Sequence, residues 1–406
     1  MTVDSAQIVR RVTLAILLVT CLNAQSDLDA VRPFTGLGGS GCRAAGLAMS
    51  FTGVADDFTA LYYNPAGLAH LTRVEINLGL SHLSVTTDVS NTSGDNTGRI
   101  TATRLNNIGF ALPVPEIKLT IAAGYHQLRS FERQREQILS YGTGSVIEEV
   151  LTEEGNIGSW SLGAGYQVTP KLALGGAIDF LTGRNIYTNI DTYLTGGVVD
   201  SSTYEQFEPD YSGVGVTMGI LLAPWQPWRI GLLLRSPQWI NIKENFIDDS
   251  DMDWPVYEYS TRCSYSLRLG SSLTLGPLLI SGDLSWFDYS QIRFESDFIG
   301  DTDIVNNEIL RTRYAIILSY SVGAELLLPG INTKLRGGYR SDPPITGDSP
   351  AEMIQNTFSF GLSVVPMPQI KIDIGYNLTT WERDIGDAGK EQIFAGNAMV
   401  NLIYRF

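Results

Sequence analysis

Apolar and polar side chains alternate with a two-residue period through most of the chain after residue 73. In the last segment, Phe394–Phe406, the even-numbered positions are mostly apolar, whereas Asn397, Asn401 and Arg405 fall on the opposite face. Soluble sheets seldom end a chain on a strand with two exposed aromatic residues. A strand that spans a bilayer accommodates them, because lipid covers one face and a polar lumen the other. The pattern therefore predicts membrane-spanning β-strands.

Turn signals divide this alternating region into segments of similar length. Proline and glycine favour chain reversal, because they supply a fixed or a positive φ. Six short turns alternate with seven longer polar stretches, which gives thirteen connections and hence fourteen strands. The six turns are Pro113–Pro115, Thr169–Pro170, Pro224–Pro227, Gly276–Pro277, Pro329–Gly330 and Pro366–Pro368.

An even number of strands, with short turns on one side and long loops on the other, is typical of bacterial outer-membrane barrels. We therefore expect an all-β fold in which residues 73–406 form a 14-stranded antiparallel transmembrane β-barrel. Several charged residues occupy the polar face of their strands and should line the lumen, where opposite charges can pair; they are Asp179, Arg268, Asp283, Glu325, Arg336, Asp373 and Arg405. A structural polar network explains them better than catalysis does, and no nucleophile–base–acid set stands out, so we expect no enzyme.

Residues 25–72 lack the alternation and are rich in small residues. A lumen enclosed by fourteen strands is wide enough to need filling, since eight strands already leave room for side chains. We therefore expect this segment to form a plug, or hatch, of short helices inside the lumen.

The first residues carry the features of a secretory signal. Arg10 and Arg11 precede the apolar run Val12–Val19, and Ala24 is a suitable cleavage position. We expect residues 1–24 to be removed and the mature protein to reside in the outer membrane of a Gram-negative-type bacterium, in contact with its lipid.

Composition narrows the chemistry. The net charge of −15 argues against binding of nucleic acid, which requires basic surface. His70, His82 and His126 have no ligand spacing, and the glycine run at residues 36–41 has no strand before it, so we expect no metal, nucleotide or other cofactor. Cys42 and Cys263 are expected to be isolated thiols, although a bridge from plug to wall is conceivable.

Three segments of the plug carry a family resemblance: Gly41–Gly46, Ala55–Ala60 and above all the N-P-A-G-L motif at Tyr63–Leu68. With the fourteen strands and the aromatic C-terminus, they make the chain similar to the FadL/TodX-like (OmpP1) family of outer-membrane transporters of fatty acids and aromatic hydrocarbons. The same signature is similar to the related PorV/PorQ-type proteins, which act as adaptors or shuttles in protein secretion.

The transporter resemblance implies three candidate regions. Asn64, Pro65, Ala66 and Gly67 correspond to the hatch motif, which in that family lies near a kinked third strand. Gly124 is our candidate for the kink, beside which substrate would leave sideways. The segment after the third strand is expected to form two short amphipathic helices of an external capture loop, through Phe131, Ile138, Leu139, Tyr141, Val146, Ile147, Val150 and Leu151.

We therefore expect a monomeric barrel that transports a hydrophobic small-molecule ligand passively, by external capture, hatch movement and lateral release. The alternative is a PorV-like adaptor that holds a secretion-system protein and transports no small molecule. A water-filled porin is disfavoured by the plug.

Overall fold

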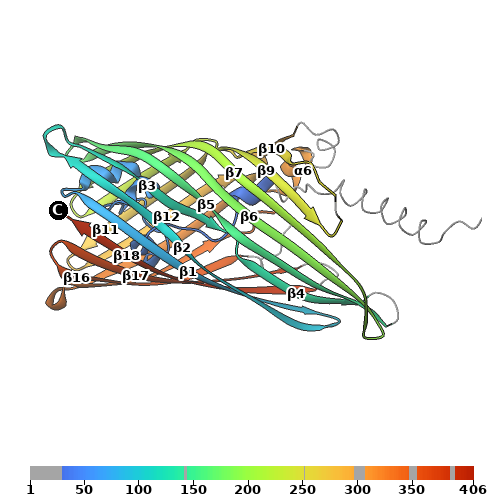
Figure 1. Ribbon diagram of the computed structural model, residues 1–406. Coiled ribbons are helices and arrows are strands. Elements are labelled where there is room, and N and C mark those ends of the chain that lie inside the picture. Colours follow the sequence, from blue (N-terminus) through green and yellow to red (C-terminus); the bar gives the residue numbers. More distant parts are fainter. Residues whose placement is uncertain (1–29, 141–143, 251, 297–306, 347–353, 385–388) are drawn as a thin grey trace, which may run out of the picture.

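The computed structural model describes residues 30–140, 144–250, 252–296, 307–346, 354–384 and 389–406. Over these residues the strands form one closed antiparallel sheet, because the first strand, β1 (Glu75–Asn91), pairs with the last, β18 (Lys390–Arg405). Figure 1 shows the resulting cylinder, with the C-terminus at the end that carries the short turns. The signal peptide expected at residues 1–24 lies outside the described residues.

The wall contains the fourteen strands predicted from the turns. Ten of the fourteen are uninterrupted. Besides β1 and β18, they are β2 (Gly94–Val114), β5 (Ser145–Thr169), β6 (Leu172–Thr195), β7 (Val198–Trp225), β14 (Ile316–Leu328), β15 (Thr333–Asp342), β16 (Gln355–Met367) and β17 (Ile370–Asp384). The other four are each divided in two: β3 (Leu119–Ser130) with β4 (Arg133–Ser140), β8 (Trp228–Arg235) with β9 (Trp239–Asp248), β10 (Tyr257–Arg262) with β11 (Ser266–Leu275), and β12 (Leu278–Asp288) with β13 (Arg293–Ser296).

The two faces of the sheet differ as the alternation predicts. On β17, Ile374 and Tyr376 are 48% and 44% exposed on the outside, whereas Asp373 and Asn377 are buried inside. The charged side chains Asp283, Glu325 and Arg336 are likewise buried in the lumen. An apolar exterior around a polar interior matches a barrel that sits in lipid. Among the described residues, no helix is long and apolar enough to cross a membrane.

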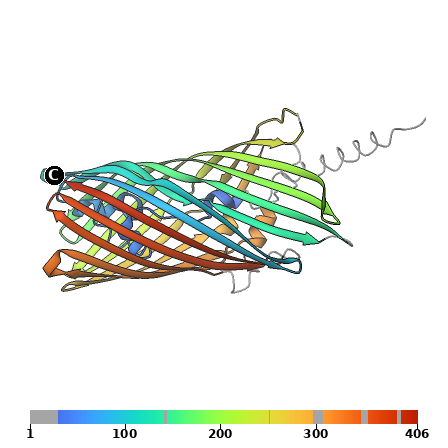
Figure 2. The same ribbon diagram turned by 60° about the horizontal axis from the view of Figure 1, so that its bottom comes forward.

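Three neighbouring strands are much longer than a bilayer requires. β5, β6 and β7 have 25, 24 and 28 residues, whereas about 9–11 residues cross the hydrocarbon core. They continue past the barrel mouth as a paired sheet, at the end opposite the C-terminus in Figures 1 and 2. Two of the seven longer polar stretches between the predicted strands, 132–155 and 188–209, are therefore largely strand, because in-register backbone pairing compensates for their lack of apolar alternation.

The hatch lies inside the cylinder (Figure 2). Its helical turns are η1 (Arg32–Phe34), α3 (Cys42–Gly46), α4 (Ala60–Tyr63) and η2 (Pro65–His70). The remaining short helices are η3 (Pro115–Ile117), η4 (Tyr289–Gln291), α6 (Asn307–Arg313) and η5 (Pro329–Ile331). Phe51, Phe58 and Tyr63 of the hatch are fully buried and form an apolar core with small residues of the wall. Cys42 and Cys263 are both buried and free.

Candidate functional site

Asn64 of the N-P-A-G motif joins the hatch to the barrel wall. Its side-chain oxygen accepts a hydrogen bond from the backbone N–H of Ala66 (3.2 Å) and so caps η2. Its Nδ2 donates to the backbone oxygens of Thr52 (3.0 Å) and of Ile220 in β7 (3.1 Å). One fully buried side chain therefore fixes a helix end, a neighbouring hatch turn and a wall strand.

Glycines in the wall allow the motif to approach closely. A Cβ at Gly219 would collide with the Asn64 side chain, and one at Gly175 would collide with the backbone of Pro65 and Ala66. Gly67 itself packs on the backbone of the hatch with no room for a side chain. The predicted hatch motif thus lies mainly against β5, β6 and β7, and only marginally against the third strand.

Ion pairs fix the hatch to the opposite side of the wall. Arg43 of α3 contacts Asp56 of the hatch and donates through Nε to Glu325 of β14 (2.9 Å). Arg336 of β15 also donates to Glu325 (2.7 Å) and contacts Asp373 of β17 (3.3 Å). Burial would raise the pKa of Asp56, but Arg43 and Arg229 outweigh it and lower that pKa. We call Arg43, Asp56, Glu325, Arg336 and Asp373 the hatch-floor network.

The wall is incomplete between β2 and β3. Their ladder ends at the pair Asn107–His126, and the part of β2 that precedes Asn107 pairs with β1 alone among the described strands. Asn106 bulges out of the β1–β2 ladder into the lumen. Its side chain accepts a hydrogen bond from Gly41 N–H (2.8 Å) and donates to Gly39 O (3.0 Å). The hatch is therefore held at the level where β2 and β3 part.

A short extended piece of the hatch occupies the place that β2 leaves. Leu37 forms a β-bridge with Ser130, whose N–H donates to Leu37 O (2.7 Å). Gly38 lies so close to Leu128 O that a Cβ would collide with it. Ser40 bonds His126 Nδ1 (2.8 Å). We call this contact, of residues 37–41 with Asn106 and residues 126–130, the seam; a cavity of about 10 Å³ lies beside it.

The kink expected at Gly124 lies further along the strand. Gly124 is in register on both sides, paired with Gly109 and Ser161. Its missing side chain makes room for the ring of Phe58 from the hatch. The register of β3 with β5 shifts between Gln127 and Arg129 instead. The glycine thus serves hatch packing, and the irregularity coincides with the end of the β2–β3 ladder.

The expected pair of amphipathic helices is wrong, because this segment is a β-hairpin of β4 and β5. Pairing across it places Ile138, Val146 and Val150 on one face and Leu139, Ile147 and Leu151 on the other. Successive side chains of a strand point to opposite faces, whereas a helix would have placed these apolar residues on one face. Phe131 is buried below the hairpin against Tyr211, and Tyr141 lies outside the described residues. The described capture residues of the hairpin therefore fall on both faces of the sheet.

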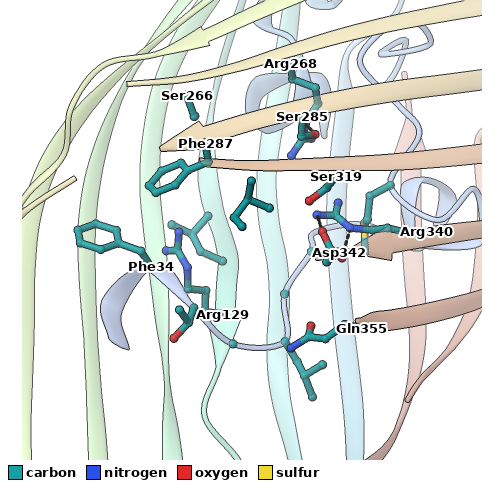
Figure 3. Close-up of a pocket in the computed structure, with 18 of the residues that line it drawn as sticks. Phe34, Arg129, Ser266, Arg268, Ser285, Phe287, Ser319, Arg340, Asp342 and Gln355 are labelled. Atoms are coloured by element: carbon teal, nitrogen blue, oxygen red, sulfur yellow. Dashed lines mark hydrogen bonds and ion pairs between the residues drawn. The ribbon is translucent and has the colours of Figure 1, made fainter. Parts of the chain in front are cut away.

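A cavity of about 300 Å³ lies in the lumen between the hatch and the outer mouth. Its walls come from the hatch, mainly residues 34–39 with Met49, Tyr62 and Tyr63, and from β1, β3, β8, β11, β12 and β14–β18. Four arginines line it, Arg129, Arg235, Arg268 and Arg340, and Asp342 is the one carboxylate in the lining among the residues that the structure describes. Figure 3 shows Arg268 and Arg340 facing the rings of Phe34 and Phe287 across this space.

Sequence reasoning placed Arg268 in the lumen but missed the other three arginines of the cavity. Arg129, Arg235 and Arg340 come from three strands that are far apart in the sequence. Strand alternation indicates the face of each residue, but the common height of residues on different strands depends on barrel shear, which the sequence does not reveal. No local signal would have grouped them.

These features define a class of protein: an outer-membrane-type β-barrel whose lumen is closed by an N-terminal hatch. A family model named BamG matches residues 8–225, more than half of the 406 residues, and the chain therefore belongs to the BamG family. A search of curated proteins found no match.

Solved structures confirm the fold that the FadL/TodX resemblance implies. A Pseudomonas aeruginosa FadL homologue aligns with a TM-score of 0.64 and 12% identity, over 92% of this chain and 100% of its own. The Pseudomonas putida toluene transporter TodX aligns with a TM-score of 0.61 and 15% identity, over 86% and 94%. The Ralstonia pickettii toluene transporter TbuX aligns with a TM-score of 0.54 and 15% identity, over 95% and 99%. At these identities the likeness concerns the fold.

Proposed function

We propose that this protein is a passive outer-membrane channel for small molecules with an apolar part. The molecule enters the lumen cavity from the outer mouth, and residues 37–41 of the hatch move away from the seam to let it leave sideways between β2 and β3. Burial of apolar area against Phe34 and Phe287 favours binding, by roughly 25 cal/mol per Å². Long-chain fatty acids and aromatic hydrocarbons are the candidate substrates.

The adjacency of the cavity and the seam carries this proposal. Leu37 and Gly38 line the cavity and also belong to the extended piece that replaces β2 beside β3. A displacement of this short piece would open the cavity toward the lipid without disturbing the hatch-floor network. The toluene transporters named above share this fold, which supports a hydrophobic substrate.

Locking the seam tests the proposal. Leu37 and Ser130 form an antiparallel bridge, so cysteines introduced together at both positions can form a disulfide that closes it. Uptake of labelled long-chain fatty acid and of toluene would be measured in cells without their own transporter. We expect the oxidised double variant to lose uptake and reductant to restore it, while each single cysteine variant transports normally. Equal uptake with the seam locked would exclude the lateral route, and no uptake by the correctly inserted wild type would exclude transport.

An adaptor that holds a secretion-system protein is the second candidate. The division of the capture residues between two faces of the β4–β5 hairpin and the long extension of β5–β7 favour it, because both present sheet surface rather than a ligand groove. Truncation of β6–β7 at the paired residues Thr188 and Gln206, with a short turn in place of the tip, separates the two functions. Loss of surface proteins from the outer membrane in this variant supports the adaptor, whereas normal uptake with an unchanged set of surface proteins supports the channel.

A further inference from the structure

Three of the four arginines that line the lumen cavity form no ion pair with a carboxylate among the described residues. Arg340 is paired, because its Nε and Nη2 donate to Asp342 at 2.6 Å each. Arg235 donates to the backbone oxygen of Tyr62 (2.7 Å) and stacks on that ring, with 4.2 Å from its Cζ to the ring centroid. Neither contact supplies a negative charge to Arg235.

The other two guanidinium groups each have a buried nitrogen without a partner. Arg268 donates through Nε to Ser285 Oγ (2.9 Å), but its Nη1 is buried and unbonded. Arg129 lies over Phe34, with 6.0 Å from its Cζ to the ring centroid, and its Nη1 is also buried and unbonded. A buried donor without an acceptor is costly, and a charged one more so.

The nearby carboxylates of Asp283 and Asp179 form their hydrogen bonds with other groups, although one oxygen of Asp283 has no hydrogen-bond partner in the described part of the chain. Asp283 accepts the backbone N–H groups of Phe51 (3.2 Å) and Thr52 (3.0 Å), which belong to the hatch. Asp179 accepts the hydroxyls of Ser161 (2.5 Å) and Thr217 (2.6 Å). Among the described residues, neither forms an ion pair with an arginine of the cavity.

The charge balance of the cavity is thus opposite to that of the protein. The chain as a whole carries −15, whereas four arginines against one aspartate give the described residues of the cavity lining a charge of +3. The pKa of Tyr62 responds to the same positive charge. Burial would raise the pKa of Tyr62, but Arg235 and Arg268 outweigh it and lower that pKa to about 8.

We propose that this cavity binds a small organic dianion, with two negative charges at one end of an apolar body, such as an aryl phosphate monoester or an aromatic dicarboxylate. Arg129, Arg235 and Arg268 contact the acidic end, and Phe34 and Phe287 contact the apolar body. Guanidinium groups match carboxylate and phosphate oxygens in pairs of hydrogen bonds. One monocarboxylate would leave two of the three charges uncompensated, and a neutral hydrocarbon would leave all three.

The cavity size fits a ligand of this kind. Its volume of about 300 Å³ is at the lower end of the roughly 300–1,000 Å³ typical of small-ligand pockets. A single ring with its acid group therefore suits it better than a long alkyl chain. The inference goes beyond the proposed function, since a dianion is neither a fatty acid nor a hydrocarbon, and it rests on that function only for the route of entry. Binding itself is independent of transport.

Calorimetric titration of the purified full-length protein in detergent tests the inference. Phenyl phosphate and phthalate are the dianionic probes, benzoate is the singly charged probe and toluene the neutral one. We expect both dianions to bind at least about tenfold more tightly than benzoate and toluene, and the difference to shrink with added salt. Equal affinity for all four probes would overturn the proposal.

Two substitutions locate the site. Arg129→Gln and Arg268→Gln keep hydrogen-bonding groups but remove the charge, so each should weaken phenyl phosphate binding at least about tenfold. Arg184→Gln, at a half-exposed arginine of β6 paired with Glu208, is the matched control and should bind as the wild type does. Heat-modifiable migration on gels establishes that each variant is folded. Unchanged binding in folded Arg129→Gln and Arg268→Gln would refute the site.

Uptake assays keep the two proposals distinct. Dianion binding without uptake of any probe would contradict the channel but support the site. Uptake of toluene without dianion binding would support the channel and contradict the site.

Discussion

Two groups of arginines occupy the same lumen but differ in their partners. In the hatch-floor network, Arg43 and Arg336 both contact Glu325, and each contacts a second carboxylate. In the outer cavity, Arg129, Arg235 and Arg268 have no carboxylate partner among the described residues, and two of them have an unbonded buried nitrogen. Both groups lie inside the lumen, so burial alone does not explain why only one of them is paired with carboxylates.

The difference indicates separate roles. Paired charges join the hatch to the wall, because the removal of either partner would leave a buried charge uncompensated. Unpaired charges of one sign repel each other in the folded state, so their presence is better explained by a ligand of opposite charge. Pairing therefore separates structural charges from binding charges within one barrel.

The largest effect on stability is expected at the hatch-floor network. Arg43→Ala leaves Glu325 and Asp56 without one of their cationic partners, and the loss of one partner of a buried pair typically costs about 3–5 kcal/mol. The free energy of unfolding in detergent should fall by that order, and the loosened hatch should raise ion conductance in planar bilayers. Arg184→Ala, at a half-exposed ion pair, should change stability by less than about 1 kcal/mol. A similar stability for both variants would show that the hatch-floor network does not fix the hatch to the wall.

Close packing of the hatch on the wall is expected to matter less. Gly219→Ala places a Cβ against the Asn64 side chain, and overpacking of this kind costs about 1–3 kcal/mol. Gly176→Ala is the matched control, because its Cβ meets only Thr217 O at 3.7 Å. Thermal unfolding of both variants measures the effect, and equal midpoints would contradict the close contact of motif and wall.

Removal of a cavity charge should have the opposite sign to removal of a floor charge. Arg268→Gln relieves repulsion from Arg235 and Arg340 and removes a buried unbonded charge, so the unfolding free energy should stay equal or rise by about 1 kcal/mol. Denaturant titration without ligand measures it. A loss as large as that of Arg43→Ala would mean that Arg268 is structural, which would end the distinction between the two groups.

The sequence was sufficient for the barrel but not for the cavity. Fourteen strands follow from alternation and turns because both are local signals, and the exposed Ile374 beside the buried Asp373 confirms the assignment of faces. The β4–β5 hairpin was missed because its polar residues, such as Glu148 and Glu149, obscure the two-residue period. A glycine that admits a ring from a distant segment, as Gly124 admits Phe58, looks identical in sequence to one that bends a strand.

The role of Asn64 could be predicted from the sequence only in part. The motif predicted a turn near the wall, and its chemistry predicted a capping bond. Its bond to Ile220 depends on how the hatch sits in the lumen, which only the tertiary structure gives. Site geometry that joins segments more than a hundred residues apart was therefore beyond local reasoning.

The smallest expected effect is a pH dependence of stability that arises from the positive charge of the cavity. The pKa of Tyr62 is lowered to about 8, whereas an unfolded tyrosine titrates near 10. Folding therefore favours the phenolate, and the stabilisation from Tyr62 is complete above pH 10 and is lost as the pH falls through 8. The neighbouring Tyr63, whose pKa burial raises, stays protonated throughout this window.

Ultraviolet titration of tyrosinate should show one group near pH 8 in the wild type and none in Tyr62→Phe, and only the wild type should gain stability from this group between pH 8 and 10. Phenyl phosphate, by neutralising Arg235 and Arg268, should move the pKa of Tyr62 back toward 10. A Tyr62 that titrates near 10 with or without the dianion would mean that the cavity arginines are already compensated, and the contrast between floor and cavity would disappear.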